Sequence, residues 1–375
     1  MTRLRRAGGL AALVLALAGP AQAQDQAEAA RQAARALEDA SLQLDRADSA
    51  RDRVSALTQT VKAYEAGLGA MRDGLREAAI RETELSRKLQ SQETEIAQLL
   101  GVLSSMGGRA APSAMLHPQG PVGAARAGMM LASVTPGLSD EAQRIRADLT
   151  EVTNLRLLQQ NAAETLKDGL AGVQQARTEL SQAIADRTDL PLRFTEDPVK
   201  TAILISATET LEGFASGLSE IAGNEKLNTL PPINDRKGAL DLPVQGQILR
   251  RAGEADAAGV TRPGIVIATQ PEALVTTPTA ATVRYAGPLL DYGLVTILEP
   301  QPDLLFVLAG LQVTYGAAGQ VLPEGSPVGL MGGSYAAPGA SPSVEATGAG
   351  RTETLYVEVR QGDGPVDPLI WFAGR

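Results

Sequence analysis

The sequence predicts an α+β multidomain protein that contains a long antiparallel coiled-coil hairpin, an amphipathic helix and a small C-terminal antiparallel β domain. Three observations predict this order. The first half of the 375-residue chain is rich in Ala, Gln, Glu, Arg and Leu at heptad spacing. A single amphipathic segment and a Pro-bearing linker follow. The last third collects Val, Ile, Gly and Pro in short apolar runs separated by turn residues, as is typical of β domains.

The N-terminus has the three parts of a secretory signal peptide. Arginines lie among the first six residues, an apolar run covers residues 9–19, and Ala-Gln-Ala ends at Ala23. The apolar run is shorter than the ~20 residues that cross a bilayer, and no later segment reaches that length. We therefore expect a signal peptide over residues 1–23, cleavage near Ala23, export, and no membrane insertion of the mature chain.

The composition argues against several kinds of chemistry. The chain has no Cys, which excludes disulfides, thiolate catalysis and Cys-based metal sites. Its net charge of −9 argues against binding to nucleic acid, which needs clustered Lys and Arg. The single histidine, His117, lies in a Gly- and Pro-rich stretch and is interpreted as a polar loop residue. We expect no cofactor.

Two apolar seams predict the hairpin over residues 24–190. The first seam covers residues 54–103 and continues backward through alanines to residue 29, as if in one helix; the second covers 145–184. A Gly- and Pro-rich stretch at about 104–138 separates them and lets the chain reverse. The alternative is a coiled coil between two chains.

The connecting stretch contains a short apolar helix candidate. It covers residues 124–132 and includes Met129, Met130 and Leu131. At the tip of a hairpin these side chains have nothing of their own to pack against. They predict either a small folded tip or a docking surface for another protein, to which methionine adapts well.

The segment 191–240 predicts one amphipathic helix and a polar linker. Pro198 suits the first helical position, and Gly223 suits the position just past the end. The apolar face is wider than a coiled-coil seam and includes Leu211, Phe214, Leu218 and Ile221. This face needs a cover, either from the base of the hairpin or from a groove on the C-terminal domain.

Residues 241–375 contain the short strands and resemble a known family. The segments "LPVQGQIL", "PGIVIAT", "YGLVTIL", "VLPEGSPVGLMG", "LYVEVR" and "VDPLIWF" follow one another in the order typical of the LytM or M23 zinc endopeptidases, which cut peptidoglycan. The resemblance covers about residues 242–372. It implies a small antiparallel β domain with a substrate cleft.

The resemblance also implies where the chemistry would lie. In active members, zinc ligands fall at the positions of Arg262, Val266 and Tyr356, and catalytic histidines at those of Leu308 and Thr354. A catalytic zinc needs about three protein ligands and an open position for water. None of these residues matches the family's ligands, so we expect a LytM-like domain without zinc that is not an enzyme.

Signal peptide, coiled coil, amphipathic helix and zinc-less LytM domain, in this order, resemble the EnvC-type murein hydrolase activators. The resemblance implies a periplasmic protein that activates N-acetylmuramoyl-L-alanine amidases in septal peptidoglycan cleavage during cell division. It implies a coiled coil that docks on an FtsE and FtsX type ABC-transporter-like complex, and a regulatory helix that causes autoinhibition. Two alternatives are a periplasmic coiled-coil structural adaptor and an active peptidoglycan endopeptidase.

A cleft that has lost its zinc ligands would remain as a groove for a helix of a partner. The expected lining residues are Val266, Tyr292, Val295, Tyr356 and Arg360. Tyr and Arg are favoured anchors at interfaces. Ordinary packing between strands would explain Val266 and Val295 equally well.

Overall fold

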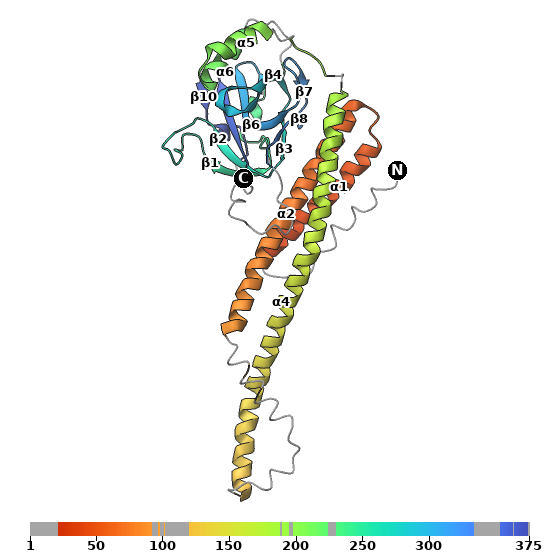
Figure 1. Ribbon diagram of the computed structural model, residues 1–375, viewed down its shortest axis with the longest axis vertical. Helices are drawn as coiled ribbons and strands as arrows, with labels where there is room; N and C mark the ends of the chain where they lie inside the picture. Colours follow the sequence, from red (N-terminus) through yellow and green to blue (C-terminus); the bar gives the residue numbers. More distant parts are fainter. Residues whose placement is uncertain are drawn as a thin grey trace. The chain divides into compact units, whose positions relative to one another are not determined.

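The computed structural model describes residues 22–91, 97, 101, 120–187, 190–194, 198–223, 230–333, 353–362 and 364–373. The predicted fold class is confirmed, with long helices in the N-terminal region and an antiparallel β domain at the C-terminus (Figure 1). The chain divides into two compact units. The first contains Arg31–Gly67 and Gly169–Arg375, and the second contains Leu68–Asp168. Within the described part of the chain, no helix is both long and apolar enough to cross a membrane.

The first helical segment is broken, although its seam predicted one continuous helix. α1 (Gln22–Asp45) and α2 (Ala50–Ser91) are separated by a short turn. Ser49 caps α2, because its Oγ accepts the backbone N–H of Asp52 at 3.1 Å and donates to the Asp52 carboxylate at 2.7 Å. The Ser49 side chain thus satisfies a backbone N–H in the first turn of α2, as is typical of an N-cap residue. The alanine-lined seam therefore belongs to a separate helix.

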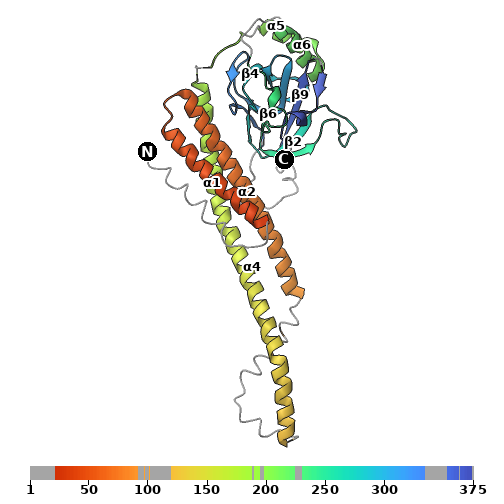
Figure 2. The same cartoon turned by 180° about the vertical axis from the view of Figure 1, so that it is seen from behind.

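α1 folds back along α2. A β-carbon at Gly67 of α2 would meet the β-carbon of Ala33 of α1 at 3.5 Å. Figures 1 and 2 both show the two helices side by side. Ala33 and Ala40 are buried, and their small side chains permit this close approach. The alanine seam thus packs within the same chain.

α4 (Gly120–Ala185) pairs with α2 as the antiparallel hairpin that the two seams predicted. Ala78 and Leu85 of α2 pack against Val152 and Leu155 of α4. The flanking ion pairs are Arg81–Glu151 at 2.9 Å, Arg156–Glu82 at 3.0 Å and Lys88–Asp148 at 2.6 Å. Glu82 pairs with Arg156, whereas Lys88, further along α2, pairs with Asp148, which is earlier in α4. The helices are therefore antiparallel, and the pairing is intramolecular.

α4 begins earlier than its seam predicted. It starts at Gly120 and contains Pro136, so the short helix expected over residues 124–132 is part of it. The remainder of the predicted tip up to residue 119, which includes His117, lies outside the described residues. Met129 is 74% exposed on α4. The side chains of Met130 and Leu131 lie outside the described part.

The C-terminal domain is one antiparallel sheet with the order β1-β2-β9-β6-β5-β4-β7. β10 pairs with β9, and β8 pairs with both β3 and β6. The strands are β1 (Gly246–Arg250), β2 (Ile265–Thr269), β3 (Leu274–Thr276), β4 (Ala281–Pro288), β5 (Leu294–Gln301), β6 (Leu304–Thr314), β7 (Val321–Leu322), β8 (Pro327–Met331), β9 (Glu353–Gln361) and β10 (Gly364–Val366).

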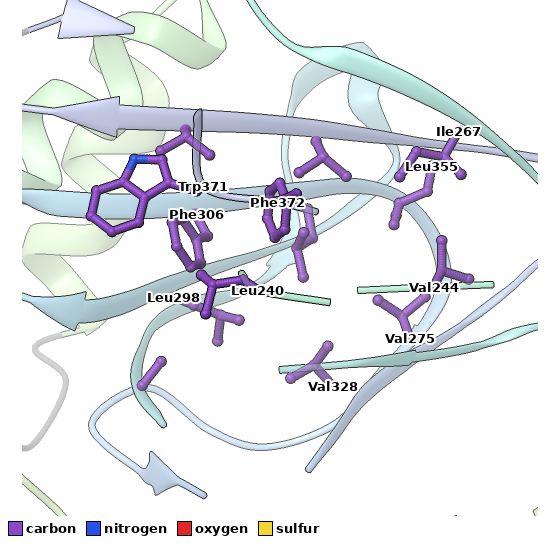
Figure 3. Close-up of a cluster of buried hydrophobic side chains, with 14 of the residues drawn as sticks. Leu240, Val244, Ile267, Val275, Leu298, Phe306, Val328, Leu355, Trp371 and Phe372 are labelled. Atoms are coloured by element: carbon purple, nitrogen blue, oxygen red, sulfur yellow. The ribbon is translucent and has the colours of Figure 1, made fainter. Parts of the chain in front are cut away.

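The two faces of this sheet bury different side chains, because successive residues of a strand point to opposite faces. On one face, Leu355, Val357 and Val359 of β9 belong to the main core. Trp371 and Phe372 close this core, with ring centres 6.2 and 5.7 Å from that of Phe306 (Figure 3). The even-numbered residues of β9 point to the other face.

The segment predicted as one amphipathic helix forms two. α5 (Pro198–Ala207) begins at the expected proline, and α6 (Leu211–Gly223) follows after a break. At this break the Oγ1 of Thr210 accepts the backbone N–H of Gly213 at 3.0 Å, which caps the new helix. Figures 1 and 2 show α5 and α6 along one side of the β domain. Asp197, which precedes α5 and would be its N-cap, lies outside the described residues.

Candidate partner-binding face beneath α6

Four strands align one row of side chains across the sheet. Val266 of β2 is paired with Tyr356 of β9, Tyr356 with Ala309 of β6, and Ala309 with Val295 of β5. Residues directly opposite each other on neighbouring strands share a face. The expected groove residues Val266, Val295 and Tyr356 therefore lie in one row on one face of the sheet, although they come from distant parts of the sequence.

α6 covers this row. Leu211, Phe214 and Leu218 are buried in the same apolar cluster as Val295 and Tyr356. The ring of Phe214 meets that of Tyr285 edge-on, with centres 4.9 Å apart. Of the two covers considered for this apolar face, the structure therefore has the C-terminal domain and not the base of the hairpin. The side chain of Ile221 lies outside the described part.

A buried polar chain runs beside the apolar row. The Tyr356 hydroxyl accepts the backbone N–H of Gly264 at 3.1 Å and donates to Glu358 at 2.7 Å. Arg360 donates to Glu358 at 3.0 Å and to the Oγ of Ser216 on α6 at 3.0 Å. Arg360 is only 2% exposed. The charged groups are thus satisfied inside the protein, and one of their partners belongs to α6.

Tyr356 is held as a neutral phenol. Burial, and then the nearby carboxylate of Glu358, raise the pKa of Tyr356 above its usual value. Gly264 allows the close approach, because a β-carbon there would lie 2.6 Å from the Tyr356 ring. The hydroxyl can therefore donate to Glu358, and an anionic phenolate is disfavoured.

Aromatic and basic side chains form the rim of this face. The ring centre of Tyr292 lies 6.2 Å from that of Tyr356. The exposed Arg262 places its guanidinium 5.7 Å from the centre of the Tyr292 ring. Tyr292 and Arg262 thus continue the site from the covered row toward solvent.

The structure corrects one of the expected cleft positions. Leu308 is fully buried in the main core beside Phe306, on the opposite face of the sheet from Tyr356. Alternation along β6 instead places Val307 and Ala309 beneath α6. The segment "LLFVLAGL" is apolar at nearly every position, so its sequence does not show which residues face which side.

The other expected ligand and catalytic positions lie at or near this face. Val266 and Tyr356 are cross-strand partners, and Thr354 is exposed two residues along β9, opposite Ala268. Arg262 precedes β2. Among the described residues, no three His, Cys, Asp or Glu side chains are grouped in a way that could hold a metal ion.

Two residues of this face were missed by the sequence reasoning. Glu358 was not among the expected groove residues, yet it is buried between Tyr356 and Arg360. The sequence could have indicated this, because Glu358 lies two residues after Tyr356 and two before Arg360 on one strand, and alternate residues of a strand share a face. Ser216 gave no signal, because its role depends on where α6 packs.

Both ends of the α5–α6 segment are fastened to the β domain. Before α5, Arg193 donates to Thr282 at 2.9 Å and pairs with the buried Glu299 at 3.4 Å. After α6, the backbone N–H of Ile233 donates to Gln301 at 2.7 Å. The segment that carries the two helices is thus attached to the β domain on both sides.

We expect Arg360→Met to lower the free energy of unfolding of the C-terminal domain by about 3–5 kcal/mol, because it leaves a buried carboxylate without its ion pair. Ser216→Ala, the matched control, removes only the bond from α6 and should cost about 1–3 kcal/mol. Urea denaturation followed by the fluorescence of the single tryptophan, Trp371, measures both. Equal losses would contradict a buried Arg360–Glu358 pair.

No protein-family model and no curated protein matches the chain. Solved structures are similar to it in part. Helicobacter pylori Csd3 matches at 20% identity and TM-score 0.28, over 36% of this chain and 35% of that one. The catalytic domain of lysostaphin from Staphylococcus simulans matches at 14% identity and TM-score 0.27, over 33% and 90%. The catalytic domain of the M23 protein EnpA from Enterococcus faecalis matches at 15% identity and TM-score 0.25, over 35% and 94%.

The match thus spans about a third of the Csd3 chain. With identities of 20% or less and TM-scores below 0.3, these three similarities concern the fold and do not identify a function.

Proposed function

We propose that the chain is a non-catalytic, periplasmic activator of a peptidoglycan amidase, and that α6 restrains the face that contacts the amidase. One observation carries the proposal. The apolar side of α6 covers Val266, Val295 and Tyr356, the row where the LytM resemblance places the former substrate cleft. A face that already accepts one amphipathic helix is suited to exchange it for a helix of a partner.

The residues of this face support binding better than hydrolysis. Val266 has no donor atom for a metal, and Arg262 carries a positive charge. The phenol of Tyr356 is neutral and already committed to Glu358 and Gly264. A hydrolase would need a metal-bound water or a placed general base. An apolar row with buried polar anchors instead supplies what a helix-binding face needs.

The proposed restraint has a suitable size. Burying Leu211, Phe214 and Leu218 contributes at most about 1.5–3 kcal/mol for each side chain. Shifting a switch from 1:99 to 99:1 requires about 5.5 kcal/mol of differential interaction. A few large side chains therefore suffice to keep the face closed, and a partner that binds the open form could offset them.

The purified chain is expected to hold no stoichiometric zinc and to release no fragments from labelled peptidoglycan, because Arg262, Val266 and Tyr356 do not form a zinc-ligand set. Elemental analysis and a dye-release assay measure these two properties. One zinc per chain, together with hydrolysis that chelation abolishes, would show an active endopeptidase instead.

Leu211→Asp should open the face and increase stimulation of a periplasmic N-acetylmuramoyl-L-alanine amidase by about tenfold or more, because a charge cannot stay in the apolar cluster. Ile203→Asp is the matched control, since Ile203 lies on neighbouring α5 and is exposed. Dye release from labelled peptidoglycan with added amidase measures the effect.

Adding Arg262→Glu to the Leu211→Asp chain should reduce the stimulation again, because it reverses the charge at the rim. Arg262 is exposed, so this change leaves the core intact. If Leu211→Asp stimulates no better than Ile203→Asp, α6 is only a structural cover. In that case a structural adaptor becomes the better reading.

The α2–α4 hairpin is the proposed attachment to the FtsE and FtsX type complex. Met129→Asp should weaken binding to the periplasmic part of that complex by about tenfold, because it charges an exposed apolar contact. Thr153→Asp, also exposed on α4, should bind like the unchanged chain. Titration calorimetry measures affinity, and circular dichroism checks helicity. Unchanged affinity of the Met129 variant would move the docking site elsewhere.

A further inference from the structure

A buried carboxylate joins the long helices to the β domain within the first unit. Glu65 of α2 has a side chain that is 3% exposed. Its Oε1 accepts Nη2 of Arg177 on α4 at 2.8 Å and the backbone N–H of Leu274 at 2.9 Å. Leu274 is the first residue of β3. One oxygen atom thus holds two helices and the start of a strand.

Arg177 connects the same helices to the β domain a second time. Its Nη1 donates to Glu272 at 2.8 Å, while its side chain is only 6% exposed. Glu272 has a φ of 55°, in the left-handed region that non-glycine residues rarely occupy. Its backbone N–H is fixed by the carbonyl of Gly332 at 2.8 Å. The turn before β3 therefore holds the carboxylate in place for Arg177.

The two helices are closely packed at this level. Val61 of α2 and Val173 and Leu180 of α4 are fully buried. A β-carbon at Gly172 would lie 2.8 Å from the ring of Tyr64, so the tyrosine ring occupies the space that a side chain would fill. A slide of α2 along α4 would therefore disturb this packing, and it would also move Glu65 relative to Arg177.

We propose that Glu65, Arg177 and Glu272 form a latch through which the β domain responds to the register of α2 against α4. Glu65 must stay within hydrogen-bond distance of donors on two other elements. A slide of one helical turn, about 5.4 Å, would separate Glu65 from Arg177, so that Leu274 and Glu272 could not both keep their partners on the two helices. A displacement imposed on the hairpin would then release its base from the turn before β3.

The charges make the latch a two-state contact. Burial raises the pKa of Glu65, while Arg177 and the Leu274 N–H act in the opposite direction. Lys62 and Asp241 are the further charged groups nearby, and burial lowers the pKa of Lys62. An ion left in this site without its partners is strongly disfavoured. We therefore expect the contact to open completely rather than loosen gradually. The proposed latch rests on these contacts alone and does not require the proposed activation of an amidase.

The test uses the full chain and Arg177→Met. Amide hydrogen exchange at Leu274 should accelerate by about tenfold or more, because Glu65 loses its ion pair and turns to water. Arg156→Met is the matched control, since Arg156 also lies on α4 and pairs with a carboxylate of α2, but is 63% exposed. That variant should exchange like the unchanged chain.

A double variant, Glu65→Met with Arg177→Met, separates the latch from folding. It removes both charges together and should preserve helicity, while Leu274 still exchanges rapidly because its acceptor is gone. The attachment of the β domain to the base of the helices is measured with two spin labels. The chain contains no Cys, so Glu179→Cys on α4 and Gln247→Cys on β1 give specific attachment at exposed sites.

The distance distribution between the labels should broaden in both latch variants and stay narrow with Arg156→Met. Identical distributions in all of these proteins would overturn the latch. So would unchanged exchange at Leu274 in both latch variants.

Discussion

The structure of the C-terminal domain depends on one constraint: its central sheet is apolar on both faces, so both faces must be covered. Along β9, Leu355, Val357 and Val359 enter the main core, while Tyr356 and the Glu358–Arg360 ion pair point the other way. A buried ion pair needs its remaining hydrogen-bonding groups satisfied, and Ser216 of α6 accepts one of the bonds that Arg360 donates. A helix on the second face is therefore a requirement of the fold.

The cover of this face is α6, which belongs to a segment attached to the β domain on both sides. α6 supplies Phe214 and Ser216 to the second face, while the chain on either side of the helices is held by Arg193 and Ile233. On the opposite face, Trp371 and Phe372 are buried among the strands in the main core. A partner that bound this face, as proposed, would have to replace the contacts that α6 makes.

Within the first unit, buried polar contacts join the helices to the same domain. Glu65 and Arg177 hold the turn before β3, whereas the ion pairs along the second unit, such as Arg81–Glu151, are largely exposed. Exposed pairs contribute little and break easily, but a buried pair has strict geometry. The base of the hairpin is therefore the place where helix register and domain contact depend on each other.

The sequence by itself determined the order of helical hairpin, amphipathic segment and β domain, because heptad spacing and short strands between turns are local patterns. It did not show the breaks after Asp45 and Ala207. It placed Val266, Tyr356 and Arg360 near one another only through a family resemblance. The tertiary structure decided what local pattern does not contain: the face of Leu308, the burial of Glu358, and the surface that α6 covers. A strand that is apolar throughout has no alternation to read, and the partner of a helix face is set by contacts between residues far apart in the chain.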